Sequence, residues 1–203
     1  MNSVSLKAVV TIISFHVSAV ASFAQSPCPA PKGEVPETAK NIIAEFQAWS
    51  VFVETDPDEC FAAADPVETT IEPVTALENL CIGASSLTVA YWPKREVNGQ
   101  LSFRSGYEFD PTVAIEFIIN DKSYPLIAEK GGQIAWPKSA DEDRNLISLM
   151  RRGSRLAIIA KSTNGANIKD TYSLSGFASA IDLAARTCSS EFHKLPRIVA
   201  HNF

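Results

Sequence analysis

Short stretches in which apolar and polar residues alternate, separated by turn-forming residues, recur along most of this chain. Ser86 to Trp92 alternates in this way, and residues 113–119 place apolar side chains on one face. Asn98-Gly99 and Asn164-Gly165 favour β-hairpins, because both residue types accept a positive φ angle. About eight such strands, with turns roughly every 8–12 residues, are typical of an antiparallel sandwich or barrel. We therefore predict a mainly β fold, an antiparallel sandwich or barrel rather than parallel units.

Two segments have the three- and four-residue spacing of a helix instead. Ser139 and Glu142 are spaced as a capping box ahead of an apolar stripe, and Gly153 can end that helix in the left-handed conformation. Near the end of the chain, Ser175 can cap a second helix. The predicted buried face of this second helix consists of Phe177, Ala180, Ile181, Ala184 and Cys188. We expect one or two short helices packed on an end or edge of the sandwich.

The first 24 residues have the features of a signal peptide. Lys7 is their only charge, residues 8–21 are apolar, and Ser22-Phe23-Ala24 places small residues where a signal peptidase reads them. A membrane anchor is the alternative, but the apolar run is shorter than the roughly 20 residues that span a bilayer. We expect cleavage before Gln25, a periplasmic or secreted protein, and no membrane span after cleavage.

The remaining chain divides into three parts. Residues 25–45 are predicted to be an extension, extended at first and then forming a short helix over residues 37–46. Residues 46–188 form the predicted β-sandwich domain, and residues 189–203 form a tail. Inside the domain, residues 65–83 are predicted to be a long irregular connection, which is either functional or held in place by Cys81.

The chain has four cysteines, Cys28, Cys60, Cys81 and Cys188. An even number in an exported protein predicts two disulfides, with buried free thiols as the alternative. Three connectivities are open from the sequence alone. We favour Cys60 with Cys188 and Cys28 with Cys81; the first pair would tie the closing helix to an early strand. Closing a loop of that length stabilises the fold by about 4–5 kcal/mol in the chain-entropy model.

The composition argues against several classes of function. A formal net charge of −5 gives no electrostatic footprint for nucleic acid. After cleavage the only histidines are His193 and His201, both in the predicted tail, so we expect no histidine-based catalytic arrangement and no zinc site. We therefore expect neither an enzyme nor a bound cofactor or metal.

Two groups of side chains are candidate binding sites. Arg151, Arg152 and Arg155 surround Gly153 and could bind a phosphate or carboxylate, although arginines at a helix end also interact with its dipole. The second group is a candidate exposed aromatic patch for protein binding, with core packing as its alternative. Its members are Tyr91, Trp92, Tyr107 and Phe109.

One acidic residue lies in a less ordinary context. Asp170 falls on the same side of its predicted strand as Tyr172. We interpret Asp170 as a member of a structural ion pair with a base such as Arg155 rather than as an acid catalyst, because structural ion pairs also shift the pKa of a carboxyl.

Several short blocks, taken together, suggest a family. They are Trp49-x-Val51, Ser105-Gly106-Tyr107-x-Phe109, Ala135-Trp136-Pro137, Met150-Arg151-Arg152-Gly153-Ser154 and the segment Asp170-Thr171-Tyr172-Ser173-Leu174-Ser175-Gly176-Phe177. Over about residues 46–188 the chain resembles the invasion-associated locus B (IalB) family of alphaproteobacterial envelope proteins. The resemblance implies a periplasmic or secreted β-sandwich of immunoglobulin-like architecture, in a family named for a role in host-cell invasion, most of whose members have no established biochemical activity.

The resemblance also bears on the cysteines. Many members carry a cysteine where this chain has Val53, and its absence leaves Cys60 free to pair with Cys188. Cys28 and Cys81 fall outside what the resemblance explains.

Two hypotheses of function follow. The first is a non-enzymatic envelope protein that binds another protein, an unidentified envelope or host protein, with a link to host-cell invasion or envelope integrity. The second is a periplasmic small-ligand or anion-binding module that uses the three arginines. The first predicts an exposed aromatic patch, and the second predicts a concave basic pocket.

Overall fold

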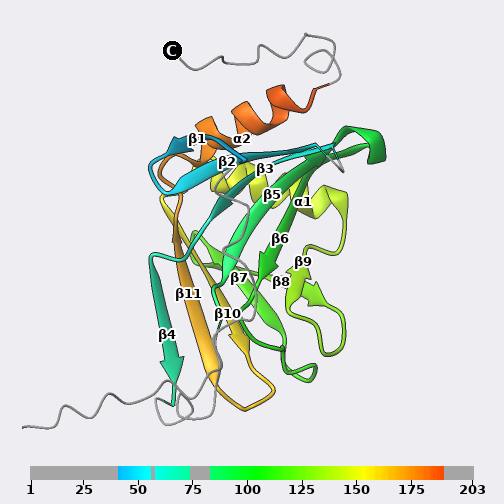
Figure 1. Cartoon of the computed structure of the whole chain (residues 1–203). Coiled ribbons are helices and arrows are strands. Elements are labelled where there is room, and N and C mark those ends of the chain that lie inside the picture. The colour runs from blue at the N-terminus through cyan, green and yellow to red at the C-terminus, as the bar shows by residue number, and fades with distance from the viewer. Residues whose placement is uncertain (1–40, 56–57, 74–82, 190–203) are drawn as a thin grey trace, which may run out of the picture.

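The computed structural model describes residues 41–55, 58–73 and 83–189, which form a mostly antiparallel β structure with two α-helices (Figure 1). The predicted signal peptide and the predicted tail beyond residue 189 lie outside this part of the chain. The strands are β1 (Ile42–Phe46), β2 (Trp49–Thr55), β3 (Asp58–Ala64), β4 (Glu68–Glu72), β5 (Ser86–Trp92), β6 (Val97–Arg104), β7 (Ile115–Ile119), β8 (Lys122–Ala128), β9 (Ile134–Trp136), β10 (Arg155–Lys161) and β11 (Asn167–Ser173). The helices are α1 (Ala140–Met150), α2 (Phe177–Thr187) and the short 3₁₀ helix η3 (Pro93–Arg95).

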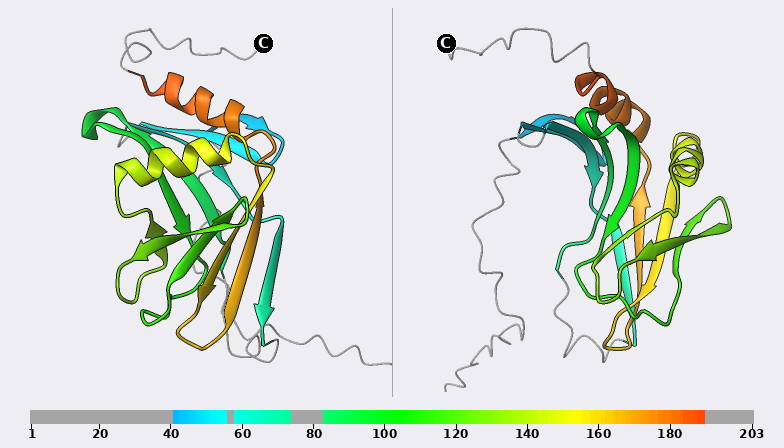
Figure 2. Two further views of the ribbon diagram at one scale, coloured as in Figure 1. Left: turned by 180° about the vertical axis from the view of Figure 1, so that it is seen from behind. Right: turned by 90° about the vertical axis from the view of Figure 1, so that its right-hand side faces the viewer.

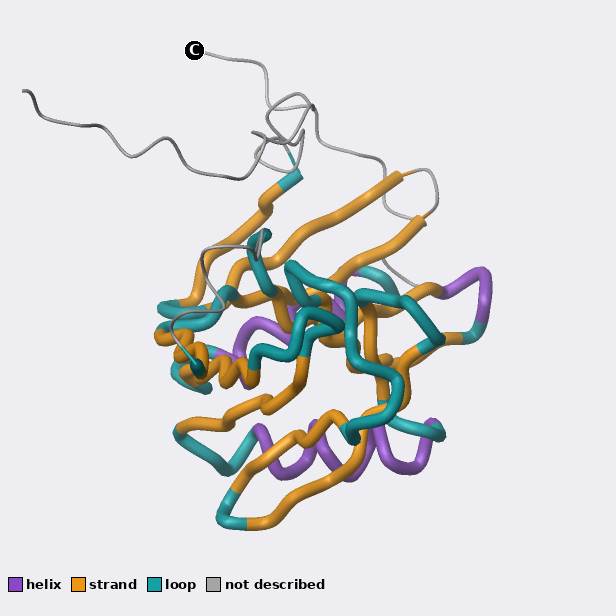
Figure 3. Tube along the Cα trace, turned by 90° about the horizontal axis from the view of Figure 1, so that it is seen from below, coloured by secondary structure: helices purple, strands orange, loops and turns teal. Residues whose placement is uncertain are grey.

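The strands hydrogen-bond in the order β1-β2-β3-β5-β6-β9-β8-β7-β10-β11-β4, and each pairing is antiparallel. The sheet folds over at β8, so that one layer runs from β1 to β9 and the other from β7 to β4 (Figure 2). The loops that connect these strands are in the foreground when the molecule is viewed from below (Figure 3). The predicted mainly β, sandwich-like fold is confirmed.

The core lies between the layers and follows from the alternation in the sequence. In β6 and β7 every second side chain is buried, as the period of two requires. The largest fully buried side chains are Trp49, Tyr172, Phe103, Phe117, Phe177, Leu87, Leu101, Ile119, Leu146, Met150, Ile158 and Ile168.

Each helix covers the sheet with the face that its apolar residues predict. α2 packs on β2 and β3, and all five residues of its predicted face are buried. α1 packs on β6, where the Asp143 carboxylate accepts a hydrogen bond from the Leu101 amide at 2.9 Å. Ser139 is the N-cap of α1 and accepts a hydrogen bond from the amide of Glu142 at 3.3 Å, as predicted.

The disulfide Cys60–Cys188 joins β3 to the end of α2, and it is the pairing that we favoured. Both cysteines are buried. The other predicted pair, Cys28 with Cys81, lies outside the described residues.

The prediction of a helix over residues 37–46 is wrong where the structure describes it. Ile42–Phe46 is a strand that pairs with β2, from Ile42↔Phe52 to Phe46↔Trp49. Gln47, at φ 55°, turns the chain between the two strands. Hydrogen bonding to β2 outweighs the weak helical preference of so short a segment.

The first predicted hairpin turn is displaced, whereas the second is correct. The chain turns from β5 to β6 at η3 and Glu96, which has φ 58°, and Asn98-Gly99 lies inside β6. Gly99 has the expected positive φ, 86°, but it serves a register shift opposite Ala90 and Tyr91 rather than a turn. Asn164-Gly165 does connect β10 to β11, with Gly165 at φ 88°.

Two predicted helix ends also differ from the structure. Gly153 does not adopt the left-handed conformation; its lack of a side chain makes room for Leu174, whose Cδ1 would lie 2.9 Å from an added Cβ. Ser175 does not cap α2, because its hydroxyl hydrogen-bonds Gln47 Oε1 at 2.7 Å. Gly176 is the N-cap of α2 and makes no side-chain capping bond.

The segment 65–83 is more regular than predicted. It contains β4, which pairs with β11 from Glu68↔Thr171 to Glu72↔Asn167. The backbone amide of Val67 also donates to the Thr171 carbonyl, at 2.8 Å. Residues 74–82, which include Cys81, lie outside the described part of the chain.

Candidate functional site

The predicted aromatic patch is not an exposed surface. Tyr91, Tyr107 and Phe109 are 8%, 4% and 2% exposed, and Trp92 is half-buried beneath the Arg95 guanidinium, which lies 5.7 Å from its ring. Tyr107 meets Phe109 edge to face, with ring centroids 5.7 Å apart, and Phe109 also packs on Phe103. These rings fill the interior because burying aromatic surface stabilises the fold more than exposing it. The prediction of an exposed patch is therefore wrong.

The three arginines do not surround a common pocket. Arg151 forms an ion pair with Asp182 of α2 at 2.5 Å, and this bond lowers the pKa of the Asp182 carboxyl. Arg152 hydrogen-bonds the Ser148 hydroxyl at 2.8 Å, on its own helix. Arg155 begins β10 on the exposed side of that strand. Arg151 and Arg152 therefore make structural contacts at the surface of α1 and α2.

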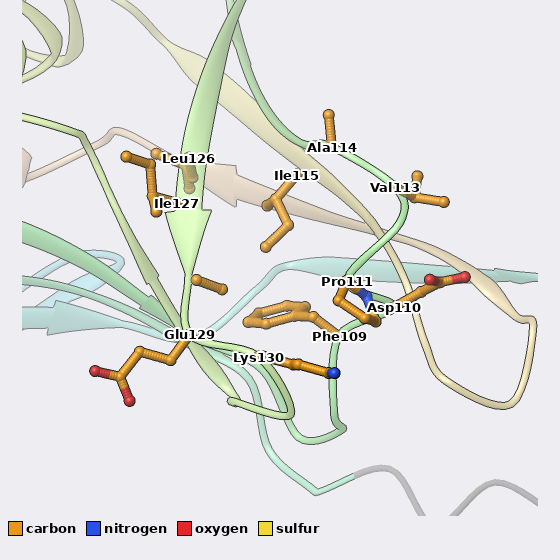
Figure 4. A pocket seen from close by; sticks show the side chains of 11 residues that line it. Phe109, Asp110, Pro111, Val113, Ala114, Ile115, Leu126, Ile127, Glu129 and Lys130 are labelled. Carbon is orange, nitrogen blue, oxygen red and sulfur yellow. The ribbon is translucent and has the colours of Figure 1, made fainter.

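A groove of about 380 Å³ lies where β7 and β8 separate. Figure 4 shows Phe109 and Ile115 between β8 and residues 111–114. Buried Phe109, Ile115 and Leu126 form the floor of the groove. Val113 and Ile127 also line it, and they are 41% and 47% exposed. Exposed apolar side chains beside an apolar floor are the usual composition of a binding groove.

The groove exists because β8 changes its partner. β8 pairs with β7 as far as Ile115↔Leu126, and then with β9 at Ile127↔Trp136. The end of β8 therefore leaves the β7 layer for the β6–β9 layer. The groove opens at this point, beside Ile115 of β7 and Leu126 of β8. Sheet corners of this kind let a sandwich switch layers.

Charged groups line the groove beside its apolar surface. The Thr112 hydroxyl and amide hydrogen-bond the Asp110 carboxylate at 2.6 and 2.9 Å, and Lys161 lies 3.9 Å from it. These contacts hold the pKa of Asp110 below its usual value, so this carboxylate is charged at neutral pH. Glu129 and Lys130 are exposed on the segment that follows β8.

Sequence reasoning missed this groove. Alternation placed Val113 on the same apolar face as Ile115, but β7 begins at Ile115 and Val113 lies on the loop before it. The Asp110-Pro111 turn was visible in the sequence and marks the start of that loop. The change of partner by β8 has no signal in β8 itself, because its partners β7 and β9 flank it in the chain and the alternation does not record where one pairing ends and the other begins.

A second candidate site is a buried polar cluster around Asp170, on β11. The Thr69 hydroxyl of β4 donates to Asp170 Oδ1 at 2.5 Å, and Ser85 also hydrogen-bonds this carboxyl. Burial raises the pKa of the Asp170 carboxyl, and these hydrogen bonds oppose part of that rise. The predicted ion pair with a base such as Arg155 is wrong, because the carboxyl faces hydroxyl groups in the interior while Arg155 is exposed.

The tyrosines beside Asp170 share its environment. Tyr172 and Tyr107 are buried, and burial together with the nearby Asp170 charge raises the pKa of both phenols well above the usual value. Asp170 Oδ2 and the Tyr172 hydroxyl have no hydrogen-bonding partner among the described residues. Residues 41–55, 58–73 and 83–189 contain no group of three or more histidine, cysteine or acidic side chains that could hold a metal ion.

No family model matches the sequence, and no curated protein matches it. Among solved structures, the chain is similar to the crystal structure of invasion associated protein B from Bartonella henselae. The sequence identity is 12% and the TM-score is 0.49, over 70% of this chain and 95% of that chain. In the part of the chain that is described, the two α-helices are not long and apolar enough to cross a membrane.

Proposed function

We propose that this chain is an exported, non-enzymatic envelope protein that binds another protein through the groove between β7 and β8. The observation that carries the proposal is the pair of exposed side chains Val113 and Ile127 beside the apolar floor of that groove. A partner segment that inserts apolar side chains there would remove this surface from water, which favours binding by about 25 cal/mol per Å² before the costs of association.

Two features support export. The first 24 residues read as a signal peptide, and the domain contains the disulfide Cys60–Cys188. Disulfides persist mainly in oxidising compartments such as the periplasm. The short blocks that resemble the invasion-associated locus B family support the same location, and a link to host-cell invasion or envelope integrity belongs to the proposal on that ground alone.

The chemistry of the buried cluster supports a non-enzymatic role. Asp170 is fully buried, and the side chain that donates to it is the Thr69 hydroxyl rather than a base. Such an arrangement does not supply a base that could activate a nucleophile. The anion-binding alternative receives no support, because Arg151 and Arg152 bond different partners and Arg155 is exposed on β10.

Crosslinking in intact cells with an amine-reactive reagent, followed by mass spectrometry without reduction, tests the proposal. Lys130 lines the groove, whereas exposed Lys169 lies on β11 outside it. We expect Lys130 to crosslink to a specific partner protein, and we expect Lys169 not to crosslink to that partner. Lys130→Arg keeps the positive charge and should remove the crosslink. Equal labelling at both lysines, or no specific partner, would count against the groove.

A further inference from the structure

The buried cluster at Asp170 contains two polar atoms that the protein leaves without a hydrogen bond. They are Asp170 Oδ2 and the hydroxyl oxygen of Tyr172, and both residues are fully buried. An unsatisfied buried polar group costs about 1–3 kcal/mol, so two in one place need a physical explanation.

The two atoms lie on the same side of one strand. Asp170 and Tyr172 are two residues apart on β11, and β11 buries every second side chain along this stretch. Burial raises the pKa of the Tyr172 phenol, and the nearby Asp170 and Tyr107 act on this phenol in the same direction. Asp170, Tyr172 and Tyr107 are all buried and lie close enough to interact, so these three side chains face one region of the interior. The Thr69 hydroxyl of β4 bonds Asp170 on one side of this region.

Tyr172 and Asp170 do not satisfy each other, because no hydrogen bond joins them directly. A metal ion is a poor occupant, since calcium takes six or more oxygen ligands and one carboxyl oxygen and one phenol are unsatisfied here. A water molecule fits this chemistry: it can donate two hydrogen bonds and accept two, and buried waters generally make two to four bonds to groups that are otherwise unsatisfied.

We propose that the fold holds one ordered internal water molecule between Asp170 Oδ2 and the Tyr172 hydroxyl. The water accepts the phenol proton of Tyr172 in a hydrogen bond and donates one of its own protons to Asp170 Oδ2. Tyr107, which interacts with the same carboxyl, forms part of the surrounding wall. This site completes the polar connection from β11 to β4, because the other oxygen of Asp170 already accepts from Thr69.

A crystal structure of the mature protein near 1.5 Å resolution tests the proposal directly. We expect a single density peak about 2.8 Å from both atoms, the usual length of such hydrogen bonds. Direct contact between Asp170 and Tyr172, or an empty space between them, would overturn it.

A solution measurement gives an independent test on the full mature chain. Oxygen-17 relaxation dispersion counts long-lived internal waters, and Tyr172→Phe should lower this count by one. Tyr124→Phe, at a half-buried tyrosine of β8, is the matched control and should leave the count unchanged. If Tyr172→Phe does not fold, the electron density between the two wild-type side chains still decides, because the crystal structure needs no variant. An unchanged count in a folded Tyr172→Phe protein would refute the assignment.

Discussion

The indole nitrogen Nε1 of Trp49 donates a hydrogen bond to the backbone carbonyl of Ser173 at 2.9 Å, across 124 positions of the sequence. This bond connects β2 in one layer to the end of β11 in the other. The same ring meets Phe177 of α2 edge to face, with centroids 4.8 Å apart. The Trp49 side chain therefore connects both layers and α2. The contacts explain why Ser173 and Phe177 lie in one short block of sequence.

Trp49→Phe should destabilise the fold by about 2–4 kcal/mol. The substitution leaves the Ser173 carbonyl without its buried donor and leaves a cavity beside Phe177. Chemical denaturation followed by circular dichroism measures the change. Trp136→Phe, at a half-buried tryptophan, is the control and should cost less. Equal costs at the two positions would show that Trp49 has no special role.

Gly176 lies where a side chain has no room. Its φ is 89°, and an added Cβ would lie 1.9 Å from the carbonyl oxygen of Phe46. Gly176→Ala should therefore cost more than the roughly 1–3 kcal/mol of backbone strain alone, because β1 or α2 must move. Gly165→Ala is a matched control, since Gly165 has φ 88° and open space around it. In thermal unfolding, Gly176→Ala should melt at a clearly lower temperature than Gly165→Ala. Similar melting temperatures would contradict the close approach of Gly176 to Phe46.

Asp170 should make stability depend on pH in a defined direction. Its pKa is raised in the fold, so the folded protein binds this proton more tightly than the unfolded chain does. Its contribution to stability is therefore largest in acid and falls as pH rises from about 3.9, the usual pKa of an unfolded aspartate. Asp170→Asn should gain stability relative to wild type as pH rises from 4 to 7.

Denaturant titrations at several pH values measure this difference. A constant difference between Asp170→Asn and wild type across the range would contradict a raised pKa.

The sequence was informative wherever burial follows a local period. Alternation predicted β5 and β7, and helical spacing predicted the buried face of α2, since these patterns record which side of an element meets the core. Cys188 on that face also pointed toward the disulfide with Cys60.

Features that depend on which other segment a stretch meets were not predictable in this way. Ile42–Phe46 is a strand only because β2 pairs with it, and Tyr107 is buried only because the second layer covers it. The groove depends on the point at which β8 changes its partner, between Leu126 and Ile127. Local composition does not record that point.

Site-specific photo-crosslinking in living cells tests the proposed binding groove most directly. A benzoylphenylalanine placed at Val113 would report from the groove, and the same residue at Val67, also exposed but beside β4, would report from elsewhere. We predict a discrete crosslinked partner from position 113 and not from position 67. Adding Ile127→Glu should abolish that crosslink, because a charge at this groove residue opposes apolar contact. Identical products from both positions, or a product at position 113 that persists with Ile127→Glu, would contradict binding through the groove.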